Sequence, residues 1–123
     1  MAKPNFAAMT PAELVERFVE IGIAQADALE EFDTGRFNRL FDAMRAVSDE
    51  LKHREPDGRT ALVALLGHPN AQVRIKAAKH TLAIAPDAAR QTLEELSASG
   101  RQPQALEAGM SLWNLEQGVF RPE

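Results

Sequence analysis

The sequence predicts an all-α protein, a single domain built from about three antiparallel helix pairs. Its 123 residues include 21 Ala and 13 Leu, but only 15 Val, Ile and Thr together, and no Tyr. Ala and Leu lose little side-chain entropy in a helix, whereas strands favour β-branched and aromatic residues. The apolar residues recur at helical spacing and do not alternate with polar residues over the length of a strand. Because Cys is absent, disulfides and cysteine zinc sites are excluded.

The first helix pair is expected over residues 11–54. Thr10 can cap the first helix, and Glu13 completes a Thr-x-x-Glu capping box. The apolar face of this helix comprises Leu14, Phe18, Ile21, Gly22, Leu29 and Phe32. After a break at residues 33–35, the second helix repeats the pattern with a narrower stripe, formed by Phe37, Leu40, Phe41, Met44, Val47 and Leu51.

Two shorter pairs are expected over residues 57–83 and 86–117. A break at residues 55–58 precedes the first of their four helices, which runs from about Arg59 to Leu66. Turn residues at 67–70 and 99–100 and a helix start at Ala85-Pro86-Asp87 separate the four helices. The short connections make successive helices antiparallel neighbours. Residues 1–9 form an arm before the pairs, and residues 118–123 form a tail after them. Both ends carry apolar residues suited to packing on the body or to binding a second copy.

The segment Leu62–Leu82 carries a motif of a known repeat family. It reads Leu62-x-x-Leu65-Leu66-x-His68-Pro69-Asn70-x-x-Val73-Arg74-x-x-Ala77-Ala78-x-x-x-Leu82. This resembles a HEAT-type repeat, in which a leucine-rich helix meets a Pro-containing turn and a second helix carries Val-Arg and small alanines at the contact. Such repeats often have an Asp in the turn that pairs with the Arg, and here Gly67-His68 stands in its place. The whole chain is similar to a small bacterial family of HEAT-like proteins described as a domain of unknown function. This resemblance implies an α-α superhelix and protein binding, but no particular activity.

Charge is distributed unevenly along the chain, whose net charge is −4. Residues 1–51 carry 5 basic and 10 acidic side chains, residues 52–90 carry 7 and 3 together with all three histidines, and residues 91–123 carry 2 and 5. The acidic balance argues against nucleic acids and against anionic membranes as partners. No apolar run approaches ~18 residues and the N-terminus lacks an apolar signal core, so a cytoplasmic protein is expected.

The basic middle of the chain provides the candidate binding site. Lys76, Lys79 and His80 lie at i, i+3 and i+4 on one face of the fourth helix, opposite its apolar arc. We interpret this face as a docking surface for a protein with an acidic patch, and the alternative is an ordinary solvated face. The candidate partner-binding residues are Lys52, Arg54, Gln72, Lys76, Lys79 and His80.

Two polar residues fall within apolar faces and are expected to be buried in structural roles. Arg74 lies inside the apolar arc of the fourth helix, which comprises Val73, Ile75, Ala77, Ala78, Thr81 and Leu82. An unpaired buried charge costs several kcal/mol, so Arg74 should contact an acidic side chain or the carbonyls at a helix end. Gln25 lies near the middle of the first helix's apolar face, and a buried amide must be hydrogen-bonded.

The other residues that could carry chemistry do not indicate an enzyme. Glu50-x-x-His53 is the only metal-like spacing, and a di-iron bundle needs two such motifs, so no metal is expected. Phosphate-binding loops, nucleophile elbows and zinc-protease motifs are absent, and no catalytic residue or cofactor is assigned. The only Trp, Trp113, shares an i, i+4, i+7 stripe with Leu106 and Met110. We expect this stripe to pack in the core, and the alternative is an adhesive surface at this end of the chain.

The sequence therefore predicts a non-catalytic protein-binding module. The resemblance implies a HEAT-like adaptor or an immunity-type protein. Two alternatives stay open: a homo-oligomer whose exposed ridge is its own interface, and a helical-repeat domain that binds nucleic acid or a small ligand.

Overall fold

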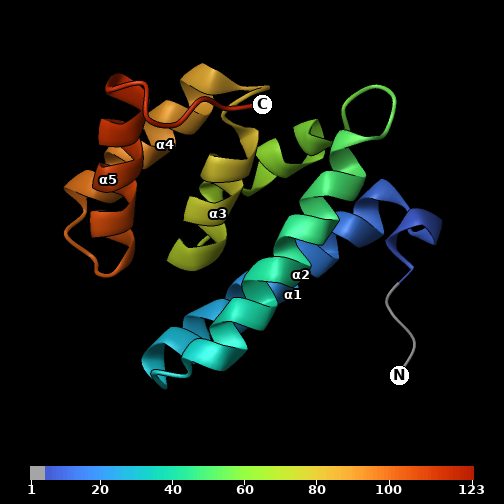
Figure 1. Cartoon of the computed structure of the whole chain (residues 1–123), viewed down its shortest axis with the longest axis horizontal. Helices are drawn as coiled ribbons and strands as arrows, with labels where there is room; N and C mark the ends of the chain where they lie inside the picture. The colour runs from blue at the N-terminus through green and yellow to red at the C-terminus, as the bar shows by residue number, and fades with distance from the viewer. Residues whose placement is uncertain (1–4) are drawn as a thin grey trace. The chain divides into compact units, whose positions relative to one another are not determined.

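The computed structural model describes residues 5–123, and these residues form helices and turns without a strand (Figure 1). The prediction of an all-α fold is confirmed. The chain divides into two compact units, residues 1–61 and residues 62–123, and each is described by itself. Within the described residues, no helix combines the length and the apolar character that a membrane crossing requires.

The first unit is a hairpin of two long helices, α1 (Pro11–Glu30) and α2 (Thr34–Lys52), which pack against each other (Figure 1). The predicted capping box is present, because the Thr10 side chain accepts from the Glu13 N–H and the Glu13 carboxylate accepts from the Thr10 N–H. A short 3-10 helix, η1 (Phe6–Ala8), precedes α1 and contacts α2. The buried side chains of the two long helices include Leu14, Phe18, Ile21, Ala28, Met44, Val47 and Leu51.

Two aromatic residues that the sequence placed on buried faces are exposed in the structure. Phe32 is 91% exposed, because α1 ends before it and the chain turns there with φ +55°. Phe41 is 46% exposed, because only the C-terminal half of α2 buries its stripe. Periodicity alone does not show how far along each helix the buried face extends.

The second unit contains three α-helices, α3 (Ala71–Thr81), α4 (Pro86–Ala98) and α5 (Gln104–Glu116). The predicted helix before them is a 3-10 helix, η2 (Gly58–Gly67), which crosses the boundary between the units. Its buried leucines, Leu62 and Leu65, are three residues apart, and this spacing suits the three residues per turn of a 3-10 helix. The spacing of apolar residues over ten residues does not distinguish a 3-10 helix from an α-helix.

Each of the three helices of the second unit packs against the other two. Their shared core is made of small and branched side chains: Ile75, Ala78, Leu82, Ala89, Leu93, Leu96 and Ala108. The N-terminus of α3 is capped by Asn70, whose side chain accepts from the backbone N–H groups of Gln72 and Val73. Ala77 and Ala78 are fully buried. Their small side chains allow neighbouring segments to approach α3 closely. All six residues of the predicted apolar arc of this helix are buried.

Candidate functional site

The polar side of α3, predicted to be a docking surface, is covered by α5. The Lys76 ammonium lies 2.8 Å from a carboxylate oxygen of Glu107, and the Lys79 ammonium lies 3.1 Å from the same atom. The side-chain amide of Gln104 donates to that of Gln72 over 2.9 Å. Lys76 and Gln72 are both buried. Their assignment to an exposed surface was therefore wrong, because α5 supplies a carboxylate and an amide that satisfy them inside the unit.

The environment of Glu107 favours its charged form. Burial by itself raises the pKa of the carboxyl group, but the charges of Lys76 and Lys79 and their hydrogen bonds together outweigh burial. The pKa of Glu107 therefore lies below its ordinary value. The ionised carboxylate of Glu107 links α3 to α5. Because Lys76 and Lys79 are paired with it, they are less available to a partner than lysines on a solvated helix face would be.

Arg74 makes both kinds of contact expected of it. Its Nε donates to the carbonyl of Leu66 over 2.7 Å, and its guanidinium pairs with the carboxylate of Glu95 on α4. The side chain is 26% exposed, so Arg74 is half-buried and bridges the end of η2 to α4 at the surface of the core. Gln25 on α1 is fully buried, as its position on the apolar face predicted.

Arg54, another predicted partner-binding residue, holds the N-terminal arm. Its Nε donates to Glu50 over 2.7 Å, and its terminal nitrogen donates to the carbonyls of Phe6 and Met9 over 3.2 and 2.9 Å. The guanidinium is therefore committed inside the first unit. Residues 1–4 of the predicted arm lie outside the described residues.

The remaining members of the predicted site are more accessible. Lys52 is exposed at the end of α2, and Lys79 and His80 are half-buried on α3. The metal-like spacing is used otherwise, because Glu50 binds Arg54 and His53 Nδ1 lies 2.6 Å from the carbonyl of Asp49. Within residues 5–123, no group of three His, Asp or Glu side chains could hold a metal ion.

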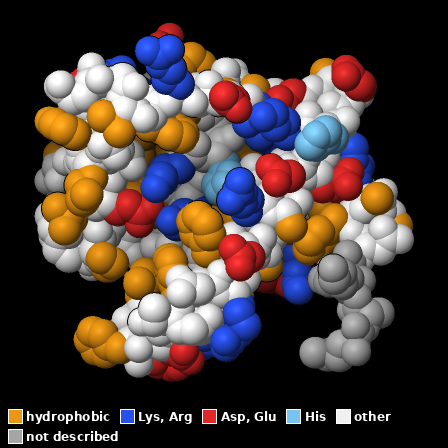
Figure 2. Space-filling view, viewed as in Figure 1, with side chains coloured by type: hydrophobic (Ala, Val, Ile, Leu, Met, Phe, Trp, Pro, Cys, Tyr) orange, Lys and Arg blue, Asp and Glu red, His pale blue; other side chains and the backbone are white. Residues whose placement is uncertain are grey.

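The exposed side of α5 carries three large apolar side chains. Leu106, Met110 and Trp113 are each more than half exposed, at 63%, 58% and 58%. Figure 2 shows hydrophobic side chains over the part of the molecule where Figure 1 draws α5. The prediction that this stripe packs in the core was wrong. The alternative interpretation, an adhesive surface, agrees with its exposure, and we call these three residues the α5 stripe.

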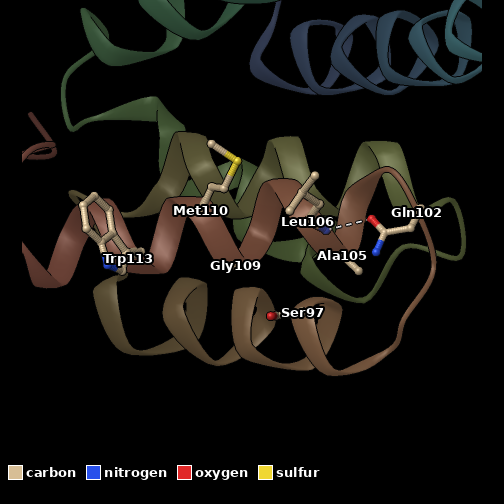
Figure 3. Close-up of a pocket in the computed structure, with 7 residues that line it drawn as sticks. All are labelled: Ser97, Gln102, Ala105, Leu106, Gly109, Met110 and Trp113. Carbon is tan, nitrogen blue, oxygen red and sulfur yellow. Dashed lines mark hydrogen bonds between the residues drawn. The ribbon is translucent and has the colours of Figure 1, made fainter.

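A shallow hollow lies beside the α5 stripe, with a volume of about 370 Å³ (Figure 3). Ala105 and Gly109 form its floor on α5, and Ser97 reaches it from α4. A Cβ at Gly109 would lie 3.2 Å from the Ser97 hydroxyl, so glycine keeps the two helices close under the hollow. At one end, the Gln102 side chain accepts from the Leu106 N–H over 3.0 Å and prolongs the first turn of α5. The seven lining residues carry no charge: Ser97, Gln102, Ala105, Leu106, Gly109, Met110 and Trp113.

The sequence contained a signal that could have located this surface. α5 has a second apolar side, on which two small residues, Ala105 and Ala108, are buried, and Leu112 and Leu115 pack against the core. Small side chains allow helices to approach closely, so the alanine side is the one that packs against α3 and α4. Assigning the larger residues to the core ignored this second face.

The fold and the site together define an all-helical protein with an exposed helix face whose hollow is lined by uncharged residues. The chain belongs to the family described as "Domain of unknown function (DUF2019)", whose family model matches residues 12–116. It is also similar to a solved structure, the protein RPA1889 from Rhodopseudomonas palustris, at 47% sequence identity and a TM-score of 0.95. That similarity covers 98% of this chain and 100% of the other. No curated protein matches the chain.

Proposed function

We propose that this protein is a non-catalytic protein-binding domain, and that the α5 stripe with its hollow is the binding face. The observation that carries the proposal is the exposure of three large apolar side chains on one helix beside an open hollow. Apolar residues exposed singly are ordinary, whereas a contiguous patch at helical spacing costs solubility and is typical of an interaction site. Trp is also, with Tyr and Arg, one of the residue types enriched among the residues that dominate binding energies at interfaces.

The proposal differs from the sequence-based one in the surface it uses. A partner with an acidic patch was expected to dock on the basic face of α3, but Lys76 and Gln72 are buried and bonded to α5. The same fact argues against the nucleic-acid alternative, since phosphate binding requires accessible basic side chains. An apolar partner surface fits the uncharged α5 stripe better than an acidic one.

The adaptor role implied by the HEAT-like resemblance is part of this proposal. The buried alanines of α3, Ala77 and Ala78, support it, because small residues at that position belong to the motif of these repeats. The bacterial origin of the matched structure supports the bacterial family expected from the sequence. The superhelical arrangement and the cytoplasmic location stay predictions.

A comparison of matched variants tests the proposal. Wild-type protein, Trp113→Ala and Ile23→Ala are immobilised and exposed to a lysate of the source cells, and bound proteins are quantified by mass spectrometry. Ile23 is a suitable control, because it is an exposed apolar residue on α1. A protein bound by wild type and Ile23→Ala is then purified, and its dissociation constant is measured with each variant.

The expected result is a binding loss of tenfold or more for Trp113→Ala and less than twofold for Ile23→Ala. If every bound protein is retained equally by the two variants, the α5 stripe is not the binding face. If the immobilised protein retains nucleic acid in place of protein, the result favours the alternative of a helical-repeat domain that binds nucleic acid.

A further inference from the structure

We infer that the partner of the α5 stripe is the α5 stripe of a second copy of this chain, paired antiparallel about a two-fold axis near Met110. This rests on the proposed function, since it names the occupant of the same face. The exposed residues Leu106, Met110 and Trp113 follow the i, i+4, i+7 spacing of a helix seam, which is the pattern that lets one helix pack along another.

A surface that meets its own copy must be self-complementary. In a two-fold interface every residue near the axis faces itself, so a charge there would meet an identical charge. The lining of the α5 stripe and its hollow carries no charge, whereas the net charge of the chain is −4. This is therefore a face on which two acidic copies can approach without direct like-charge contact.

The charges at the two ends of α5 select the antiparallel orientation. Arg101 precedes the helix and Glu116 ends it; both residues are exposed, and the Glu116 carboxylate also pairs with Arg90 of α4 at 3.3 Å. A parallel pair would bring arginine to arginine and glutamate to glutamate. An antiparallel pair brings each Arg101 end towards the Glu116 end of the other copy, which is favourable for the side chains and for the helix dipoles.

The hollow provides space for the largest side chain of the stripe. When the axis lies near Met110, the antiparallel arrangement places Trp113 of one copy beside Leu106 of the other. There the floor of the hollow is formed by Ala105 and Gly109, which have little or no side chain (Figure 3). A volume of about 370 Å³ is sufficient for an indole ring, since a cavity of about 150 Å³ holds benzene. Each indole would thus fill the hollow of the other copy.

A single-helix seam buries less area than a standard interface, so the dimer should be weak, with a dissociation constant on the order of 10 µM. Sedimentation velocity over a concentration range from about 1 to about 500 µM brackets this constant and measures it directly. Because Trp113 is the only Trp, its fluorescence reports the same contact. We expect the emission to shift to shorter wavelength as the dimer forms, and Trp113→Ala to weaken dimerisation at least tenfold, with Ile23→Ala unchanged.

A charge exchange at the axis makes the test specific to this geometry. Met110→Glu and Met110→Lys should each be monomeric, because identical charges then face each other across the axis. Mixing the two variants in equal amounts should restore a dimer, since the new carboxylate of one variant would face the new ammonium of the other. Unfolding curves of the two variants confirm that each one is folded.

The outcomes separate this inference from the proposed function. A chain that stays monomeric at every concentration overturns the self-pairing, and so does a dimer that survives both charged variants unchanged. If the chain is monomeric and another protein loses binding with Trp113→Ala, the proposed function stands and only the identity of the partner was wrong. If neither dimer nor bound protein depends on Trp113, both proposals fail.

Discussion

The two sides of α5 each depart from the pattern of an ordinary surface helix, because the inner side adds polar residues to its buried alanines and the outer side is apolar. Its inner side places Gln104 and Glu107 against α3, where they meet buried Gln72 and Lys76. Its outer side exposes the α5 stripe. In an ordinary amphipathic helix the apolar side faces the core and the charged side faces water. The difference teaches that polarity alone does not decide which side of a helix is buried, because a side with small residues can also bury polar residues that find matching partners.

The largest expected effect comes from breaking the polar contact on the inner side. Glu107→Leu leaves the buried ammonium of Lys76 without its carboxylate, and removing one partner of a buried pair typically costs about 3–5 kcal/mol. We expect a loss near the lower end, about 3 kcal/mol, because Lys79 is partly exposed and stays solvated. Urea unfolding followed by circular dichroism measures the free energy.

The matched control is the double variant Lys76→Met with Glu107→Leu. It replaces the buried ammonium of Lys76 and the half-buried carboxylate of Glu107 by apolar side chains of similar size, and such replacements are often neutral. We expect stability within about 1 kcal/mol of wild type. A double variant as unstable as Glu107→Leu alone would show that the contact stabilises by shape and not by charge.

The same contact predicts a pH dependence for stability. The pKa of Glu107 is lower in the folded protein than its ordinary value, which is about 4.3 in an unfolded chain. The stabilisation is therefore complete above that ordinary value and is lost progressively as the pH falls through the lower folded pKa. Unfolding free energies measured from pH 7 down to pH 3 should fall more steeply for wild type than for the double variant. Equal slopes would mean that Glu107 is not held in its charged form.

Much of the fold follows from the sequence, because capping residues and small buried residues mark helices locally. Thr10 and Glu13 make the capping box that their positions predicted, and the apolar arc of α3 is buried throughout. The site was harder, because the burial of Lys76 depends on a carboxylate 31 residues later in the chain. A single helix pattern does not contain such a distant partner. The exposure of Trp113 likewise depends on which of two apolar sides α5 uses.

The C-terminal ends of α1 and α5 can be compared directly, because another exposed apolar residue, Phe32, lies at the end of α1. α1 and α5 finish in the same capping motif: the N–H of Asp33 donates to the Ala28 carbonyl, and that of Val119 donates to the Asn114 carbonyl. The residue with positive φ is Gly118 at the end of α5, but Phe32 at the end of α1. Glycine adopts this conformation without the steric cost that a β-carbon brings.

We therefore expect Phe32→Gly to stabilise the protein by about 1 kcal/mol, since the exposed ring contributes little burial. Gly118→Ala is the reciprocal change and should destabilise by a similar amount. Thermal unfolding of the two variants should shift the melting temperature in opposite directions. A loss of stability in Phe32→Gly would show that the aromatic ring contributes more to the fold than its exposure suggests.

The smallest expected effect is the most informative about the outer side of α5. Trp113→Ala removes a large side chain that is 58% exposed, and alanine preserves the helix, so we expect the free energy of unfolding of the monomer to change by less than about 1 kcal/mol. Leu93→Ala truncates a fully buried side chain in the same unit and should cost about 3 kcal/mol. Measured at protein concentrations well below the dimer constant, this pair of variants separates the role of Trp113 in folding from its role in binding. If Trp113→Ala lowers the free energy of unfolding as much as Leu93→Ala does, the indole belongs to the core and the outer side of α5 is not a binding face. If Trp113→Ala changes the free energy of unfolding little, the monomer does not require Trp113 for its stability. The contacts of this side chain with another molecule then account for a tryptophan at this exposed position.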